Sequence, residues 1–183
     1  MTGDPAMRIS EDRYDRERRR LELALRFLRH EARTQTIRKW TALSDDRIRK
    51  LYRSYLSRAA CRLARHRGKS PQQIAYFARS LKIQQETALL ASLFCLGDLL
   101  PREPSVEAAA ALPDLGRGRA LCAAFETYRA MVPSAVISFE HAVFLALALA
   151  RGDQLRLGTC SECGGLIVAE RFPLRAKRCQ HCA

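Results

Sequence analysis

The 183-residue chain lacks a long apolar segment. Its longest purely apolar run, residues 142–150, has nine residues, whereas a helix needs roughly 20 to cross a bilayer. The first twenty residues are dominated by Asp, Glu and Arg, so the pattern of a secretory signal peptide is missing. We therefore expect no membrane span, no export by the signal-peptide route and a cytoplasmic location.

Acidic residues are scarce. The chain has 19 Asp plus Glu against 32 Lys plus Arg, which gives a formal net charge of +13. Twenty of the basic and nine of the acidic residues precede residue 70, so almost the whole excess lies in the first third. Clustered positive charge attracts polyanions, nucleic acid first among them. For the charge alone, a solvated face without a ligand is the alternative.

Motifs for catalysis are missing too. The four His are dispersed, the acidic residues carry no partner motif, and no GxxxxGK[ST] phosphate loop occurs. We therefore expect a binding protein rather than an enzyme. With 48% hydrophobic and 28% charged residues, the composition is that of a soluble globular domain, which excludes a disordered or collagen-like chain.

The chain does carry helical periodicity. Apolar residues recur three and four positions apart up to about residue 150, which predicts a mainly α fold. We expect helices over 14–28, 34–40, 45–56, 114–131 and 138–150, one beginning near Pro71 and one ending near Leu100. The expected N-caps are Ser44, Ser70 and Ser138, and Gly152 should end the last helix. Short extended runs after Gly152 predict a small β module. The expected regions are a basic helical part (1–69), a helical core that also binds a partner (70–153) and a zinc ribbon (154–183).

Four of the seven cysteines form two C-x2-C pairs separated by fifteen residues. Two such pairs aim four sulfurs at one point, and Zn²⁺ accepts this tetrahedral thiolate set with no position left for catalysis. We predict one structural zinc ion per chain. Disulfides in an exported protein and an iron site with the same ligands are the alternatives. The ligands would be Cys160, Cys163, Cys179 and Cys182. We expect the other three, Cys61, Cys95 and Cys122, to be small core residues.

The segment 34–56 has the layout of a helix-turn-helix, with a four-residue turn before the second helix. At about 100° per residue, one face of that helix is apolar and the opposite face is cationic. A recognition helix needs this arrangement, because one side packs on the domain while the other meets the major groove. The predicted apolar face holds Ile48, Leu51, Tyr52, Tyr55 and Leu56. The predicted DNA contacts are Arg38, Lys39, Arg47, Arg49, Lys50 and Arg53.

Two other functions suit the same features. An RNA- or ribosome-associated zinc-ribbon protein without promoter specificity would also be basic, but it should expose aromatic rings among its cations. Here Trp40, Tyr52 and Tyr55 fall on or near the predicted apolar side, which argues against it. A scaffold subunit would use the ribbon for protein contact and bind no nucleic acid.

Two stretches of the sequence resemble FlhC, the zinc-containing subunit of the bacterial flagellar master regulator. They are CSECGGLIV at 160–168 with RCQHC at 178–182, and ARTQTI at 32–37 with LSDDRIRKLY at 43–52. The resemblance implies a transcriptional activator in a heterohexamer of four FlhD and two FlhC subunits. Such an assembly binds promoters of flagellar genes and assists RNA polymerase, and the family's zinc ligands correspond to the four cysteines named above.

Overall fold

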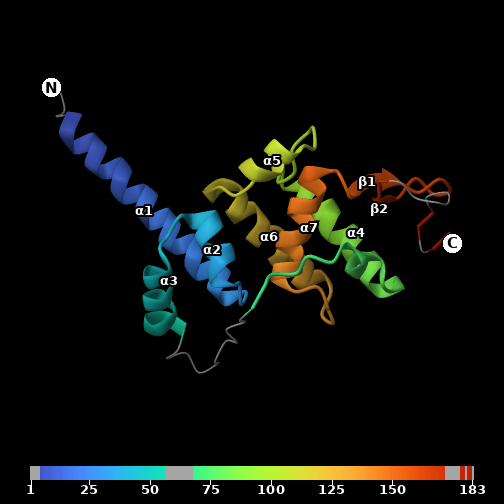
Figure 1. The fold of residues 1–183 in the computed structure, drawn as a ribbon, viewed down its shortest axis with the longest axis horizontal. Coiled ribbons are helices and arrows are strands. Elements are labelled where there is room, and N and C mark those ends of the chain that lie inside the picture. Colours follow the sequence, from blue (N-terminus) through green and yellow to red (C-terminus); the bar gives the residue numbers. More distant parts are fainter. Residues whose placement is uncertain (1–4, 57–67, 172–177, 180, 183) are drawn as a thin grey trace. The chain divides into compact units, whose positions relative to one another are not determined.

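The computed structural model describes residues 5–56, 68–171, 178–179 and 181–182. The chain divides into two compact units, residues 1–67 and 68–183. As predicted, the described part is mainly helical, and its two β-strands lie near the C-terminal end (Figure 1). Within those ranges, no helix combines the length and the apolar character needed to cross a membrane.

The first unit is built around an apolar contact between its first two helices. The rings of Phe27 and Trp40 lie 5.9 Å apart, and Leu23, Ile37 and Ile48 are buried around them. These residues belong to three helices, so the third helix is held on the first two by its one buried side chain. The elements are α1 (Pro5–Arg29), α2 (Thr34–Thr41), α3 (Asp45–Leu51) and the π-helical turn η1 (Tyr52–Leu56).

The turn between α2 and α3 begins and ends as the sequence predicts. Ala42 adopts a left-handed conformation with φ 55°, which ends α2. Ser44 is the N-cap of α3, and its hydroxyl accepts a hydrogen bond from the N–H of Arg47 at 3.5 Å. Asp45 and Asp46 lie in the first turn of α3, where negative charge suits the helix dipole. Two helices joined by a short turn are therefore present, but the α-helical part of the second one ends at Leu51 instead of continuing to Leu56 as the sequence predicts.

Two predicted helix boundaries in the second unit are wrong. Residues 71–73 are not helical; a short 3₁₀ helix, η2 (Ile74–Ala78), follows them, and α4 (Leu81–Leu96) begins only after Ser80. The hydroxyl of Ser80 accepts the N–H of Ile83 at 3.3 Å, so this serine caps the helix in place of Ser70. The other end lies before Leu100, because Asp98 takes a left-handed conformation with φ 50°.

The last helix, α7 (Phe139–Arg151), is the centre of the second unit, and it contacts α4, α5, α6 and β1 (Figure 1). It is buried along most of its length, as its apolar sequence predicts. Ser138 caps its first turn and Gly152 ends it with φ 66°, both as expected. The helices around it are α5 (Val106–Ala111) and α6 (Leu115–Met131) together with α4.

A buried carboxylate ties α4 to the segment between α6 and α7. Glu86 is 4% exposed, and one of its oxygens, Oε2, accepts hydrogen bonds from the hydroxyl of Tyr128 and from the N–H of Val136 at 2.9 Å. The N–H of Ile137 donates to the hydroxyl of Tyr128 at 3.1 Å. The ammonium of Lys82 lies 3.9 Å from the other carboxylate oxygen. Helical periodicity does not reveal this polar cluster.

The β module that the sequence predicts after Gly152 is present, and its strands β1 (Leu155–Thr159) and β2 (Leu166–Glu170) pair as an antiparallel hairpin. In its register, Leu155 pairs with Glu170 and Thr159 pairs with Leu166. The first C-x2-C pair therefore occupies the connection between the strands. Among the other cysteines, Cys122 is buried as predicted, but Cys95 is exposed because α4 turns it away from the core; Cys61 lies outside the described residues.

Candidate functional site

The first cysteine pair lies in a tight turn between β1 and β2. The N–H of Cys160 donates to the carbonyl of Gly165 at 2.8 Å, and the N–H of Gly164 donates to the carbonyl of Cys160 at 3.0 Å. Gly164 has φ 69°, a conformation that a residue with a side chain rarely adopts. The turn also directs the N–H of Glu162 to the sulfur of Cys160 at 3.4 Å. These backbone hydrogen bonds therefore hold the Cys160 sulfur in a defined position within the turn.

The second pair completes a four-cysteine cluster. The sulfur atoms of Cys160, Cys163, Cys179 and Cys182 all lie within 4.8 Å of one another, and all four cysteines are free of disulfides. The Sγ atoms of Cys163 and Cys179 are 3.6 Å apart. A tetrahedral site with metal–sulfur bonds of about 2.3 Å requires sulfur–sulfur distances of about 3.8 Å. The cluster could therefore hold a metal ion with little rearrangement.

The sulfurs differ in their electrostatic surroundings. The backbone N–H groups of Cys163 and Cys179 donate to the Cys160 sulfur and lower the pKa of that thiol to about 6. The thiols of Cys179 and Cys163 raise the pKa of Cys182 to about 12. Without a cation, the cluster thus favours a thiolate at Cys160 and a protonated thiol at Cys182. A bound metal ion replaces such protons, because thiolates are the form that ligates.

Contacts on both sides of the cluster connect it to the rest of the second unit. The guanidinium of Arg178 pairs with Glu162 at 3.2 Å, which joins the two cysteine pairs. The side chains of Gln85 on α4 and His181 approach to 3.5 Å, and β2 packs on α4. His181 is exposed. The cluster therefore lies close to α4.

In the first unit, the structure brings the six predicted DNA contacts to the surface. They come from α2, from α3 and from η1, and all six are exposed. Ile48, on the opposite side of α3, is only 1% exposed. The cationic and buried sides of α3 are therefore those predicted. The residues are Arg38 and Lys39 on α2, Arg47, Arg49 and Lys50 on α3, and Arg53 on η1.

Three of these cations already have carboxylate partners, which the sequence analysis missed. Arg38 is 3.7 Å from Asp45, and Arg49 is 3.1 Å from Asp46. Arg47 pairs with Glu17 of α1. The Arg49–Asp46 pair could have been found from its spacing of three residues within one helix. The other two pairs join different helices and depend on the fold.

One aromatic residue does not lie where helical periodicity places it. Tyr55 is 62% exposed instead of belonging to the apolar face of α3. The reason is the π-helical turn η1, which changes the angle between successive side chains after Leu51. Tyr52 remains half-buried, Trp40 is buried, and the side chain of Leu56 lies outside the described residues. An exposed ring two residues after Arg53 weakens the sequence argument against single-stranded nucleic acid.

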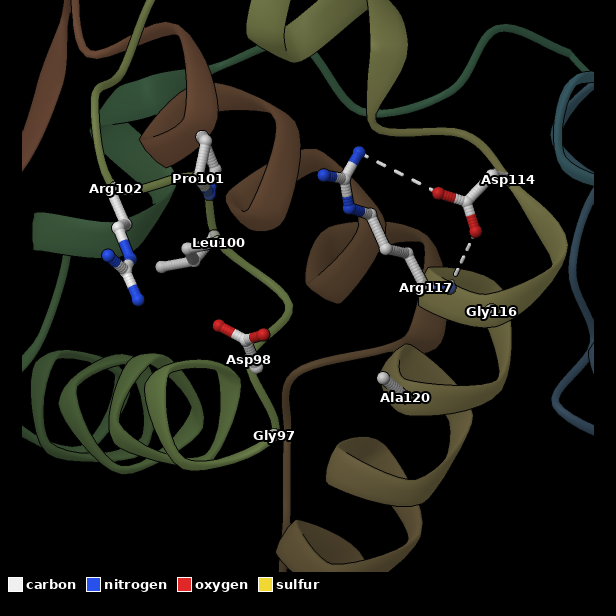
Figure 2. A pocket seen from close by; sticks show the side chains of 9 residues that line it. All are labelled: Gly97, Asp98, Leu100, Pro101, Arg102, Asp114, Gly116, Arg117 and Ala120. Atoms are coloured by element: carbon white, nitrogen blue, oxygen red, sulfur yellow. Dashed lines mark hydrogen bonds and ion pairs between the residues drawn. The ribbon is translucent and has the colours of Figure 1, made fainter.

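A hollow of about 490 Å³ lies between the end of α4 and the start of α6 (Figure 2). Asp114 and Arg117 face each other on one wall, where the guanidinium lies 3.6 Å from the carboxylate. The same carboxylate accepts the N–H of Arg117 at 2.8 Å as the N-cap of α6, and the guanidinium donates to the carbonyl of Ala111 at 3.1 Å. The capping of α6 therefore explains why the Asp114 carboxylate and the Arg117 guanidinium lie on this wall.

In comparisons with known proteins, no family model and no curated protein matched the chain. The functional argument therefore depends on the two arrangements described above: the four-cysteine cluster of the second unit and the cationic face of α2, α3 and η1 in the first.

Proposed function

We propose that the chain binds double-stranded DNA through the cationic face of its helix-turn-helix and carries a structural zinc ion in its C-terminal module. The observation that carries the proposal is the two-sided α3, whose Ile48 is 1% exposed while Arg47, Arg49 and Lys50 face solvent. A helix of this kind can rest on its own domain and still present cations to phosphates and base edges.

The more specific form of the proposal is a sequence-specific transcriptional activator of flagellar genes. Its support is the resemblance of segments 32–52 and 160–182 to the FlhC family. On this proposal the chain acts in the cytoplasm, assembles with an FlhD-type subunit into a heterohexamer and works with RNA polymerase at promoters. The role is one of binding and assembly rather than catalysis.

Zinc is the metal that the donor set favours. Four soft thiolates in a small tetrahedral cluster suit Zn²⁺, and a complete set of protein ligands is typical of structural rather than catalytic sites. Iron accepts the same four ligands. Native mass spectrometry of the purified chain should find one zinc ion per chain. Iron, or disulfides without a metal, would contradict this part of the proposal.

DNA binding is tested with a flagellar promoter fragment and a duplex of unrelated sequence. The affinity should fall steeply with salt, and each phosphate contact that is removed should lower the slope of log affinity against log salt by about 0.9. Lys50→Gln on α3 should show this loss, whereas Arg129→Gln, exposed on α6, should bind like the wild type. Equal affinity for both duplexes would contradict the sequence-specific activator and leave non-specific DNA binding.

The second candidate is the RNA- or ribosome-associated protein, which the exposure of Tyr55 favours. Base stacking on such a ring is worth about 1–3 kcal/mol in single-strand binders. Competition between a single-stranded RNA and the promoter duplex separates the two functions. If RNA competes better and Tyr55→Ala weakens only the RNA complex, the second candidate replaces the first.

A further inference from the structure

A single carboxylate of α1 lies between two arginines of the first unit. One oxygen of Glu17, Oε1, pairs with the guanidinium of Arg47 on α3. The other oxygen, Oε2, lies 3.8 Å from the guanidinium of Arg20, one turn further along α1. The Oε1 atom is shielded from solvent. Two guanidinium groups from two helices therefore converge on one negatively charged group.

Both arginines are held by ordered helices. The N-terminal half of α1 extends past α2 and α3 (Figure 1), and every side chain from residue 11 to 16 is exposed. Glu17 is the first residue after that stretch to be partly buried. On the other helix, the Ser44 cap fixes the backbone of Arg47. The backbone positions of the two arginines are thus set by the fold.

The surface next to this carboxylate is hollowed and rich in arginine. A hollow of about 420 Å³ runs along α1, and two further guanidinium groups line it beside Arg20. Its walls are formed by Asp12, Arg13, Arg16, Glu17 and Arg20. If one phosphate of a nucleic-acid backbone took the position of the Glu17 carboxylate, its neighbouring phosphates would therefore lie along a surface with more arginines.

A carboxylate and a phosphate diester present similar oxygens to guanidinium groups, and arginine binds both through paired N–H donors. Arg47 also belongs to the face proposed above to contact DNA. We propose that Arg20 and Arg47 form a clamp for a backbone phosphate of double-stranded DNA, and that Glu17 fills this clamp in the free chain. The inference rests on the proposed DNA-binding function. Glu17 then acts as an internal competitor that weakens binding to DNA of unrelated sequence.

The matched control is a second glutamate on the same helix. Glu22 pairs with Arg18 at 3.5 Å on α1 alone, so Glu22→Gln removes the same charge without opening the clamp. The probe is a duplex of unrelated sequence, and binding is followed by fluorescence anisotropy at low salt. Glu17→Gln should tighten binding about twofold to fivefold, the upper part of the range expected when one partner leaves a partly exposed ion pair. Glu22→Gln should change it less than twofold, and adding Arg20→Gln to Glu17→Gln should remove the gain.

Each other outcome overturns the inference. Weaker binding by Glu17→Gln would show that the carboxylate positions Arg47, and equal gains in both variants would show only a long-range effect of charge. A gain confined to single-stranded RNA would overturn the assignment to duplex DNA. If neither the wild type nor a variant binds any duplex, the proposed function itself fails. Should Glu17→Gln not fold, Glu17→Asp draws the charge back by one methylene and should give a smaller gain.

Discussion

Removal of the proposed zinc ion should unfold the C-terminal hairpin and leave the helices of the second unit folded. The hairpin has little apolar support of its own: Leu155 and Ile167 are its buried hydrophobic strand residues, with exposures of 3% and 9%. Two buried side chains are few for ten strand residues. We therefore expect β1 and β2 to depend on the cysteine cluster that closes the turn between them.

The magnitude follows from the burial. Leu155 and Ile167 together stabilise the hairpin by about 3–6 kcal/mol, whereas ordering its ten strand residues costs about 10–20 kcal/mol. The deficit is roughly 5–15 kcal/mol, and binding of a structural zinc ion supplies about 10–16 kcal/mol. By contrast, α7 is buried along most of its length and needs no metal to stay folded.

Hydrogen exchange read by mass spectrometry checks this expectation, with native mass spectra to confirm the loss of metal. After chelation, amides of residues 155–170 should exchange rapidly while those of α6 and α7 stay protected. Cys163→Ser should act like chelation, and Cys95→Ser, which changes an exposed cysteine outside the cluster, should not. A hairpin that keeps its protection without metal would refute the reasoning, as would the loss of protection throughout the unit.

Three further predictions concern stability. Tyr128→Phe removes the hydroxyl that donates to Glu86, so the free energy of unfolding measured in urea should fall by about 1.5–3 kcal/mol; an unchanged value would mean that the bond contributes nothing. Burial raises the pKa of Tyr128 above its ordinary value near 10, so the folded state holds the phenol proton more tightly than the unfolded state. This contribution should be complete below about pH 10 and be lost as the pH rises further, and Tyr128→Phe should flatten that decline. Gly152→Ala should lower stability by about 1–3 kcal/mol, because φ is 66° and the new Cβ would lie 2.6 Å from Pro104; thermal unfolding would contradict this if the melting temperature did not fall.

Sequence reasoning predicted those features that depend on a few neighbouring residues. The Ser44 and Ser138 caps and the end of α7 at Gly152 are confirmed, and the small β module expected after Gly152 is present. The four cysteines were found from spacing alone, because two C-x2-C pairs restrict where their sulfurs can meet. In each case the local geometry leaves few alternatives.

The failures share a different cause. Ser70 was expected to cap a helix, but Ser80 does so, and both serines have the local chemistry of a cap. Tyr55 was placed on the apolar face by a constant angle per residue, which the π-helical turn η1 does not keep. The Glu17–Arg47 pair joins two helices that no sequence period relates. Such outcomes depend on competition between tertiary contacts.

The ion pairs change how the net charge of the first unit should be understood. An exposed ion pair contributes about 0.2–1 kcal/mol, whereas a good pair of hydrogen bonds to a base discriminates by about 1–3 kcal/mol. A duplex that offers such base contacts can therefore break the ion pairs of Arg38, Arg47 and Arg49 with a net gain in binding free energy. A duplex that offers only phosphates exchanges one ion pair for another, so the net gain is small. If the chain binds DNA as proposed, these three carboxylates should reduce non-specific binding more than specific binding. On the proposed function, Glu17 of α1 and Asp45 and Asp46 of α3 should therefore contribute to sequence specificity although they contact no base.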